Sequence, residues 1–333
     1  MITNRKIILM NRPTGKPYKT NFEFTEESLQ PITNKEVTVK THYLSVDPYL
    51  RNTMRKEKFV GPPAPLGEVF GGGAVGEVVE TNSDLFQKGD YVSGHWGWQT
   101  YANVEDNQIT KLNAELAPIS TALGVLGIAG LTAYFGMIEI GKPKAGETVV
   151  ISGAAGSVGM LAGQIAKIHG ARVIGIAGSN KKNCYLKNEL RFDGTINYQA
   201  TTNLKSSLQQ VAPNGIDVYF DNVGGNISDA VMPLINSGAR IPISGQISQY
   251  NLEKPELGPR IGMFLVKNNA LIQGFAYMQY ESHFPYALET LSKWIKDNKL
   301  KYKEHIVEGF ENTPKAFEGL FSGENIGKLL VRI

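Results

Sequence analysis

The glycine-rich stretch SGAAGSVG, residues 152–159, combines residue types and spacing that could hold a phosphate group. Its glycines, Gly153, Gly156 and Gly159, are three residues apart, with only small residues between them. Without side chains at these positions, backbone N–H groups can approach the pyrophosphate of a dinucleotide closely. Similar glycine patterns also occur in ordinary flexible turns, so the interpretation depends on the flanking residues.

The flanks of this stretch predict a strand, a turn, a helix and a second strand. ETVVIS, residues 147–152, is a short β-branched run that is typical of a buried strand. After the glycines, apolar residues recur at helical spacing, at Val158, Leu161, Ile165 and Ile168. Gly170 is predicted to end the helix, and RVIGIA, residues 172–177, to form the next strand. This βαβ pattern is the context that a dinucleotide-binding loop requires; a glycine-rich turn in an unrelated α/β protein is the alternative.

The tip of the second strand indicates which dinucleotide binds. NAD-binding proteins have an acidic residue about 20 residues beyond the glycine loop, which accepts hydrogen bonds from the ribose hydroxyls. Here the tip reads AGSNKK, residues 177–182, and contains no acid. The hydroxyl of Ser179 and the ammonium groups of Lys181 and Lys182 would suit a 2′-phosphate instead. The sequence therefore favours NADP, with solvated surface lysines as the alternative.

Three further apolar runs, residues 215–225, 238–245 and 270–275, predict more strands of the same sheet. Their carboxyl ends fall at Asp221–Asn222, Ser244–Gly245 and Phe275. In an open parallel sheet, ligands bind at this edge. The small and polar residues there would leave room for a flat nicotinamide ring, although turn residues also commonly follow strands for local reasons.

The remaining sequence predicts a second domain. The first third of the chain reads as β-rich, and its end reads as strand, helix and strand. We therefore predict an α/β protein in which a doubly wound parallel-sheet domain, the Rossmann fold, is inserted into a β-rich substrate domain. The predicted boundaries assign residues 1–120 and 293–333 to the substrate domain and residues 121–292 to the NADP-binding domain. A length of 333 residues suits two such domains.

The composition narrows the class of partner to a small molecule. A formal net charge of +3 gives no sign of a nucleic-acid partner. The sequence has no run of 18 apolar residues, so we expect no membrane association and a cytoplasmic location. The single cysteine, Cys184, excludes an intrachain disulfide and a zinc site built from several thiolates.

Six motifs are spread over nearly the whole chain: LSVDPYLR (44–51), GLTAYFGMIEIGKPKAGETVVISGAAGSVG (130–159), AGSNKKNCYLK (177–187), FDNVGG (220–225), ARIPISGQISQYN (239–251) and GENIGK (323–328). In these motifs the chain resembles the medium-chain dehydrogenase/reductase superfamily. Within it, the chain is similar to the zinc-independent prostaglandin reductases, plant double-bond reductases and bacterial curcumin reductases. The resemblance implies a GroES-like substrate domain around the Rossmann domain, a homodimer, and NADPH-dependent reduction of the carbon–carbon double bond of α,β-unsaturated ketones and aldehydes.

The same resemblance implies roles for individual residues. For the cofactor they are Gly156, Ser157, Val158 and Gly159 at the pyrophosphate, Lys182 and Tyr198 at the 2′-phosphate, Asn222, Ser244, Gly245 and the loop to Tyr250 along the cofactor, Phe275, Ala276 and Tyr277 on the nicotinamide side, and Asn325 from the C-terminal segment. Tyr49 and Tyr250 are implied as substrate contacts. Two features depart from the family pattern: the chain is one residue longer between Lys182 and Tyr198, and Arg191 stands where a glycine is usual.

The resemblance also bears on the chemistry. Gly72 and Gly73 stand in place of the His and Glu that a GHE triplet supplies near the metal of zinc alcohol dehydrogenases, so we expect no metal. Without a metal, a hydrogen-bond donor must stabilise the enolate oxygen that forms when a hydride reaches the β-carbon. The candidates are the 2′-hydroxyl of the nicotinamide ribose and the phenol of Tyr250. A Tyr250 ring that only packs against the cofactor is the alternative.

Two other functions remain open at this point: a quinone oxidoreductase with the same fold and cofactor, and a sensor that binds NADPH without turning it over. Further residues that could line an apolar substrate cleft, with packing as the alternative for each, are Tyr49, Arg51, Trp96, Trp98, Tyr277 and Tyr280.

Overall fold

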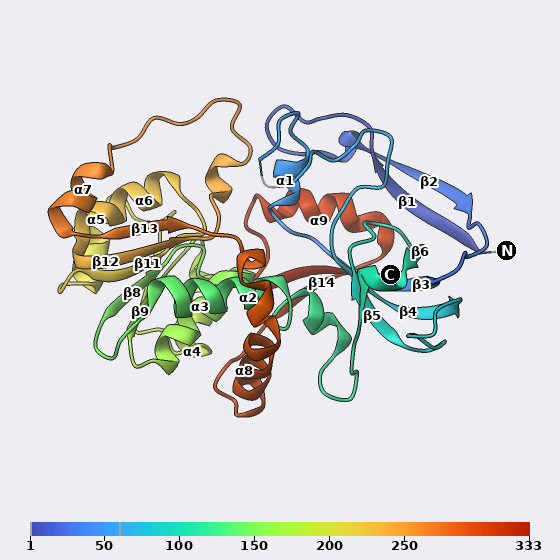
Figure 1. Ribbon diagram of the computed structural model, residues 1–333. Coiled ribbons are helices and arrows are strands. Elements are labelled where there is room, and N and C mark those ends of the chain that lie inside the picture. The colour runs from blue at the N-terminus through green and yellow to red at the C-terminus, as the bar shows by residue number, and fades with distance from the viewer. Residues whose placement is uncertain (1, 60) are drawn as a thin grey trace. The chain divides into compact units, whose positions relative to one another are not determined.

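The computed structural model describes residues 2–59 and 61–333, which divide into two compact units (Figure 1). The first unit contains the described residues up to Gly124, with Glu304–Asn325 and Leu329–Ile333. The second unit contains Val125–Lys303 and Ile326–Lys328.

The chain leaves the second unit later than residue 293, the predicted position. Helix α8 (Phe284–Lys296) runs through that residue without a break. Its residues Ala287 and Leu291 are fully buried in the core of the second unit, so the helix cannot be divided between units. The first crossing, after Gly124, lies close to the predicted residue 120.

The first unit consists mainly of antiparallel strands. Strands β1 (Thr3–Leu9) and β2 (Phe22–Ser28) form a two-stranded sheet. A seven-stranded sheet has the order β14 (Glu304–Glu308), β15 (Lys328–Arg332), β3 (Glu36–Ser45), β4 (Ala74–Thr81), β5 (Tyr91–Gly94) and β7 (Ile109–Lys111), with β6 (Tyr101–Glu105) paired to β3. The helical segments are α1 (Leu50–Thr53), η1 (Lys19–Asn21), η2 (Asp106–Gln108), η3 (Ile119–Leu123), η8 (Phe310–Asn312) and α9 (Thr313–Leu320).

Aromatic side chains form the core of this unit. The Trp98 ring lies edge-on to Phe70 and Phe317, with ring centroids 5.0 and 5.5 Å apart. Trp98 is fully buried, and its indole N–H donates to the backbone oxygen of Ser45. Trp96 is buried as well and donates to the Thr41 hydroxyl. Both tryptophans therefore pack in the core of this unit, which is the packing alternative that the sequence left open.

The second unit contains one six-stranded sheet, in which every neighbouring pair of strands is parallel. Its order is β10 (Gly194–Asn197), β9 (Arg172–Ala177), β8 (Thr148–Ile151), β11 (Ile216–Phe220), β12 (Ile235–Ile243) and β13 (Leu271–Gly274). The direction in which the chain adds strands reverses between β8 and β11, as in a doubly wound sheet. The predicted fold class is therefore confirmed.

Helices cover both faces of this sheet (Figure 1). Helices α2 (Ile128–Phe135), α3 (Ser157–Ile168), α4 (Asn180–Asn188) and α8 share one core, and α5 (Leu204–Val211), α6 (Gly225–Val231) and α7 (Gly262–Asn268) share the other. Alternate residues of β8 enter the two cores, Val149 and Ile151 on one face and Val150 on the other. Short helical turns are η4 (Gly136–Gly141), η5 (Met232–Leu234), η6 (Ile247–Gln249) and η7 (Tyr277–His283). None of the helices in the described ranges combines the length and apolar character needed to cross a bilayer.

Candidate functional site

The glycine stretch forms the turn between β8 and α3. Gly153 has a φ of 57°, a left-handed conformation that favours glycine. A Cβ on Gly159 would overlap the backbone oxygen of Gly153, so the close approach of helix and turn requires glycine there too. Gly156 is the N-cap of α3 and has no side chain that could occupy the first N–H groups of the helix. Ser157, Val158 and Gly159 are the first residues of that helix, and such a terminus suits a pyrophosphate.

The C-terminal segment reaches this turn. The backbone N–H of Gly327 donates to the oxygen of Ala155 at 2.8 Å, and Gly327 forms a β-bridge with Gly156. Asn325, predicted to contact the cofactor, is the buried residue two positions before Gly327. Asn325 belongs to the first unit, whereas Ile326–Lys328 pack in the second.

The tip of β9 carries the residues predicted to bind a 2′-phosphate. Ser179 is the N-cap of α4, and its hydroxyl accepts a hydrogen bond from the backbone N–H of Lys182. Burial lowers the pKa of the Lys182 ammonium below its ordinary value. Within the described part of the chain, no acidic side chain pairs with Lys182 to offset this cost. A half-buried cation without an acidic partner at a helix N-terminus is a suitable place for an anion.

Tyr198 lies at the same strand tip. Its backbone N–H donates to the oxygen of Ala177 at 3.2 Å. Its phenol oxygen would be 3.2 Å from a Cβ built on Gly178, the residue before Ser179. The structure thus brings Tyr198 beside Gly178, the residue before Ser179, with the extra residue in the connection. Arg191 has a φ of 58°, a left-handed conformation that favours glycine, which the family resemblance implies for this position.

Asn222 and Ser244 lie at the carboxyl ends of β11 and β12. The side-chain amide of Asn222 donates to the oxygen of Ser152 at 2.7 Å, and its carbonyl accepts from the Ser244 hydroxyl at 2.7 Å. These bonds connect the glycine turn to both neighbouring strands. The sheet edge predicted to line the cofactor is therefore rigidly cross-linked.

Tyr250 folds back over the same edge. Its phenol oxygen accepts a hydrogen bond from the backbone N–H of Gln246 at 3.1 Å. The same oxygen would be 3.1 Å from a Cβ on Gly245, so the ring lies close to the chain after β12. A phenol in this position has the chemistry of a hydrogen-bond donor to a substrate oxygen.

The segment after β13 contributes packing through its side chains. The Phe275 ring lies edge-on to Phe220, with centroids 6.3 Å apart, and Tyr277 stacks on Phe284 at 5.6 Å. Tyr280 stacks on Phe135 at 4.7 Å. Phe275 and Tyr277 thus have ring partners within the protein, and Ala276 between them begins η7 as its N-cap.

Two residues at this edge were given no individual role from the sequence, although Gln246 belongs to the loop implied to lie along the cofactor. Asp221 follows β11 and is 2% exposed, and Gln246 follows β12 and donates its side-chain amide to the Asp221 carboxylate at 2.8 Å. Their positions in the motifs FDNVGG and ARIPISGQISQYN were the available signal.

The remaining candidate, Tyr49, lies in the first unit next to Gly72. A Cβ on Gly72 would be 2.6 Å from the phenol oxygen of Tyr49. The tyrosine can therefore take this position only because residue 72 has no side chain. Arg51 is buried and holds the N-terminal loop through hydrogen bonds to the oxygens of Pro13 and Gly15. Burial, with a smaller effect of Arg55, lowers the pKa of Arg51 to about 10.

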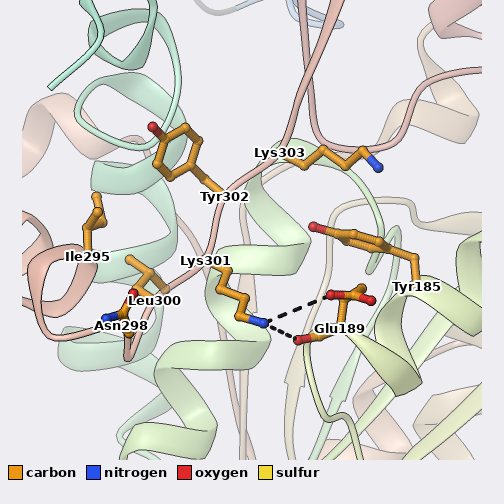
Figure 2. A pocket seen from close by; sticks show the side chains of 8 residues that line it. All are labelled: Tyr185, Glu189, Ile295, Asn298, Leu300, Lys301, Tyr302 and Lys303. Atoms are coloured by element: carbon orange, nitrogen blue, oxygen red, sulfur yellow. Dashed lines mark hydrogen bonds and ion pairs between the residues drawn. The ribbon is translucent and has the colours of Figure 1, made fainter.

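A groove of about 620 Å³ lies elsewhere in the second unit (Figure 2). Its lining residues are Tyr185, Glu189, Ile295, Asn298, Leu300, Lys301, Tyr302 and Lys303. Lys301 pairs with Glu189 at its rim, and the Lys303 ammonium lies 4.8 Å from the centroid of the Tyr185 ring (Figure 2). None of the predicted site residues lines this groove.

Comparisons with known proteins agree with this geometry. Residues 5–112 match the family described as the N-terminal domain of oxidoreductase, and residues 157–293 match the family described as zinc-binding dehydrogenase. YfmJ of Bacillus subtilis (strain 168) is 49% identical over 333 residues, which cover 99% of this chain and 98% of that protein. The NADPH-dependent curcumin reductase of Escherichia coli (strain K12) is 39% identical, with 99% and 97% covered. The 2-alkenal reductase (NADP(+)-dependent) of Nicotiana tabacum is 40% identical, with 100% and 98% covered.

Solved structures give the same result. CurA from Vibrio vulnificus in complex with NADPH superposes with a TM-score of 0.94 at 41% identity, covering 98% of both chains. The Escherichia coli quinone oxidoreductase complexed with NADPH has a TM-score of 0.77 at 20% identity, with 99% of this chain and 100% of that chain covered. At that identity, the second likeness concerns the fold alone.

The name of the second matching family raises the question of zinc. Gly72 and Gly73 offer no ligand atoms, and the Tyr49 phenol lies close to where a side chain of residue 72 would begin. Among residues 2–59 and 61–333, no three His, Cys, Asp or Glu side chains are grouped in a way that could hold a metal ion. These residues do not fit the zinc site that the family name implies. Related proteins match nearly the whole length of the sequence, and the chain belongs to the medium-chain dehydrogenase/reductase superfamily, in the branch of its curcumin-reductase and 2-alkenal-reductase relatives.

Proposed function

We propose that this protein is an NADPH-dependent reductase of the carbon–carbon double bond of α,β-unsaturated ketones and aldehydes. The observation that carries the proposal is the phenol of Tyr250 at the carboxyl edge of a dinucleotide-binding sheet, held by the Gln246 N–H at 3.1 Å. The names of two relatives, a curcumin reductase and a 2-alkenal reductase, support this substrate class.

The proposed cofactor site follows the sheet edge. The turn Gly156–Gly159 holds the pyrophosphate through the N-terminus of α3. Ser179, Lys182 and Tyr198 bind the 2′-phosphate, because the cation of Lys182 has no acidic partner among the described residues. The residues proposed along the nicotinamide half are Asn222, Ser244, Gly245, Phe275, Ala276 and Tyr277, and Asn325 is proposed as a further cofactor contact. Since NADPH is regenerated inside cells, we also propose a cytoplasmic location.

The proposed chemistry uses few protein groups. NADPH, when bound, supplies the hydride that reaches the β-carbon of the substrate. The electron pair of the double bond then moves toward the carbonyl, and negative charge develops on its oxygen. Tyr250 would stabilise this enolate oxygen by donating a hydrogen bond from its phenol, and water would supply the proton that the α-carbon takes up to complete the saturated product. Tyr49 is proposed as a further substrate contact.

We also propose that the protein is a homodimer that joins through β13. This strand is at the end of the sheet order, and edge strands offer backbone groups to a second strand. Leu271 on β13 is 50% exposed, and Met263 and Val266 on α7 are 75% and 79% exposed. A second copy would cover these apolar side chains. The expected result is a dimer by light scattering for the natural protein and a monomer for Val266→Glu; a natural protein that is monomeric would overturn this part.

The direct test of the function is NADPH oxidation with three substrates: a medium-chain 2-alkenal, a conjugated diarylenone and a benzoquinone. We expect turnover of the 2-alkenal and of the diarylenone. Oxidation by the quinone alone would favour the quinone oxidoreductase alternative. Only a likeness of fold connects this chain to such an enzyme. NADPH binding without turnover of any of the three would contradict the proposal and favour a binding role.

A further inference from the structure

Asp221, directly after β11, is a buried carboxylate surrounded by hydrogen-bond donors. Oδ1 accepts from the Ser152 hydroxyl (2.9 Å), the Tyr219 phenol (2.9 Å) and the backbone N–H groups of Val223 (3.0 Å) and Gly224 (2.9 Å). Oδ2 accepts from the Ser228 hydroxyl (2.7 Å) and the Gln246 side-chain amide (2.8 Å). These donors come from the end of β8, from β11 and the turn after it, from α6 and from the loop after β12. One buried charge therefore ties together the segments that form the sheet edge.

The donors of this network are well defined. Burial, and then the nearby Asp221 carboxylate, raises the pKa of the Tyr219 phenol well above its ordinary value, so Tyr219 remains protonated and donates. The Ser152 hydroxyl donates to Asp221 and accepts from the backbone N–H of Asn222 at 2.8 Å. It therefore helps to fix the backbone of Asn222, the residue after Asp221.

Gln246 links this network to Tyr250. Its side chain donates to Asp221, while its backbone N–H donates to the Tyr250 phenol oxygen at 3.1 Å. Gly224 makes room for this arrangement, because a Cβ there would collide with the side-chain oxygen of Gln246, and its φ of 74° suits glycine. The side chain and the backbone N–H of Gln246 thus each make one hydrogen bond, which connects the loop that carries the phenol to Asp221.

Two backbone hydrogen bonds also hold the turn η6, which lies between Gln246 and Tyr250. The backbone N–H of Ile247 donates to the oxygen of Asn222 at 3.3 Å, and that of Ser248 donates to the oxygen of Val223 at 3.1 Å. Both acceptors are on the turn that Asp221 organises. Displacing the Asp221–Gln246 contact would therefore move the Tyr250 loop relative to the sheet edge.

We propose that Asp221 is a positioning residue for this site: acting through Gln246, it holds the Tyr250 phenol where the substrate oxygen must meet it. The inference rests on the proposed function and deepens it. Asp221 touches neither substrate nor cofactor in this proposal, and the path to the reacting oxygen runs through Gln246 and Tyr250. Its removal should therefore impair turnover more than cofactor binding.

The primary test uses Gln246→Ala, because loss of the Asp221 carboxylate would also destabilise the unit. Gln209→Ala, on an exposed face of α5, is the matched control. Misplacing a reacting group can cost up to about 100-fold, and we expect kcat for a diarylenone to fall about 10-fold in Gln246→Ala with little change in the Kd for NADPH. The control should retain natural kinetics. An unchanged kcat, or a Kd that rises as much as kcat falls, would overturn the proposal.

A double-mutant cycle tests the route through Tyr250. Tyr250→Phe removes the acceptor of the Gln246 N–H, so Gln246→Ala should have almost no further effect on kcat in that background. Effects on kcat that multiply would show that Gln246 acts by another route and would contradict the proposal. Asp221→Asn, if it folds, should give the same lack of additivity with Tyr250→Phe.

Hydrogen–deuterium exchange separates this proposal from the proposed function. The segment 244–252 should exchange slowly in the natural protein and in Gln209→Ala, and faster in Gln246→Ala. If the natural protein does not reduce enones but this pattern appears, the function fails and the positioning link stands. Equal exchange in all three proteins would overturn the link, whatever the substrate.

Discussion

The hydroxyl of Ser179 accepts a hydrogen bond from the backbone N–H of Lys182 at 3.3 Å. Ser179 is thus the N-cap of α4, and Lys182 lies in the first turn of that helix. This cap fixes Lys182 in the first turn of α4, where the helix dipole also favours an anion. Burial lowers the pKa of Lys182, which means that the protein without cofactor bears a cost for its charge. A bound 2′-phosphate would remove that cost.

Replacing Lys182 should therefore weaken the binding of NADPH without lowering the stability of the cofactor-free protein. Lys182→Met keeps the apolar stem and removes the charge. Loss of one charge-assisted contact is worth roughly 1.5–3 kcal/mol, so the Kd for NADPH should rise about 10- to 100-fold. The Kd for NADH, which has no 2′-phosphate, should hardly change, and the Tm of the cofactor-free protein should rise slightly. Titration of both nucleotides by fluorescence measures the difference.

The neighbouring residue provides the control for this prediction. Lys181 is exposed, and Lys181→Met should leave the preference for NADPH nearly intact. Equal weakening of NADPH and NADH by Lys182→Met would contradict the assignment of the 2′-phosphate site.

A second prediction concerns the substrate side. Gly72→Ala would place a methyl group about 2.6 Å from the Tyr49 phenol oxygen and displace that ring. If Tyr49 contacts the substrate, the KM for a diarylenone should rise severalfold, while the Kd for NADPH should not change. Gly262→Ala is the control, because a Cβ there meets no atom within 4 Å. A Gly72→Ala protein with natural KM would remove Tyr49 from the substrate site.

A third prediction follows from the buried carboxylate. Asp221→Ala leaves its donors without an acceptor, and each unsatisfied buried donor costs about 1–3 kcal/mol, so the free energy of unfolding should fall by more than about 3 kcal/mol. Asp84→Ala, at an exposed position, should change it by less than about 0.5 kcal/mol. Thermal unfolding followed by circular dichroism compares the two. Similar midpoints for both variants would mean that the network does not stabilise the second unit.

A fourth prediction concerns Arg191, whose φ is 58°. A left-handed conformation costs a side chain about 1–2 kcal/mol, and glycine loses about 0.5–1 kcal/mol through its flexibility when unfolded. Arg191→Gly should therefore increase the free energy of unfolding by up to about 1 kcal/mol in a urea titration. Arg191→Ala keeps the strain and should give no such increase. A gain of the same size in both variants would point to the charge of Arg191 as the cause.

The sequence predicted the strongly periodic parts of this fold well. The helix expected from Val158, Leu161, Ile165 and Ile168 spans Ser157–Ile168, and Gly170 after it has a φ of 80°. Strand β10 was not predicted, because its four residues, GTIN, are too few to show a period. The later domain boundary also depends on tertiary packing, since only the burial of Ala287 and Leu291 shows to which core α8 belongs.

The site could be predicted only in part for a similar reason. Strand ends and glycine turns are readable in sequence, so residues at the sheet edge such as Asn222 and Ser244 could be named. The role of Gln246 depends on a contact between loops that are 25 residues apart, Asp221 to Gln246, and no local pattern encodes it. The rings of Phe275 and Tyr277 likewise pack against Phe220 and Phe284, which the spacing of residues in the sequence could not indicate.

The most direct test of the central claim is the position of the transferred hydrogen in the product. A conjugated diarylenone would be incubated with the protein and with NADPH that carries deuterium at both C4 positions, and the product would be identified by NMR. The expected product is a saturated ketone with one deuterium on the carbon β to the carbonyl. An allylic alcohol with deuterium on the former carbonyl carbon, or recovery of the unchanged enone, would contradict it.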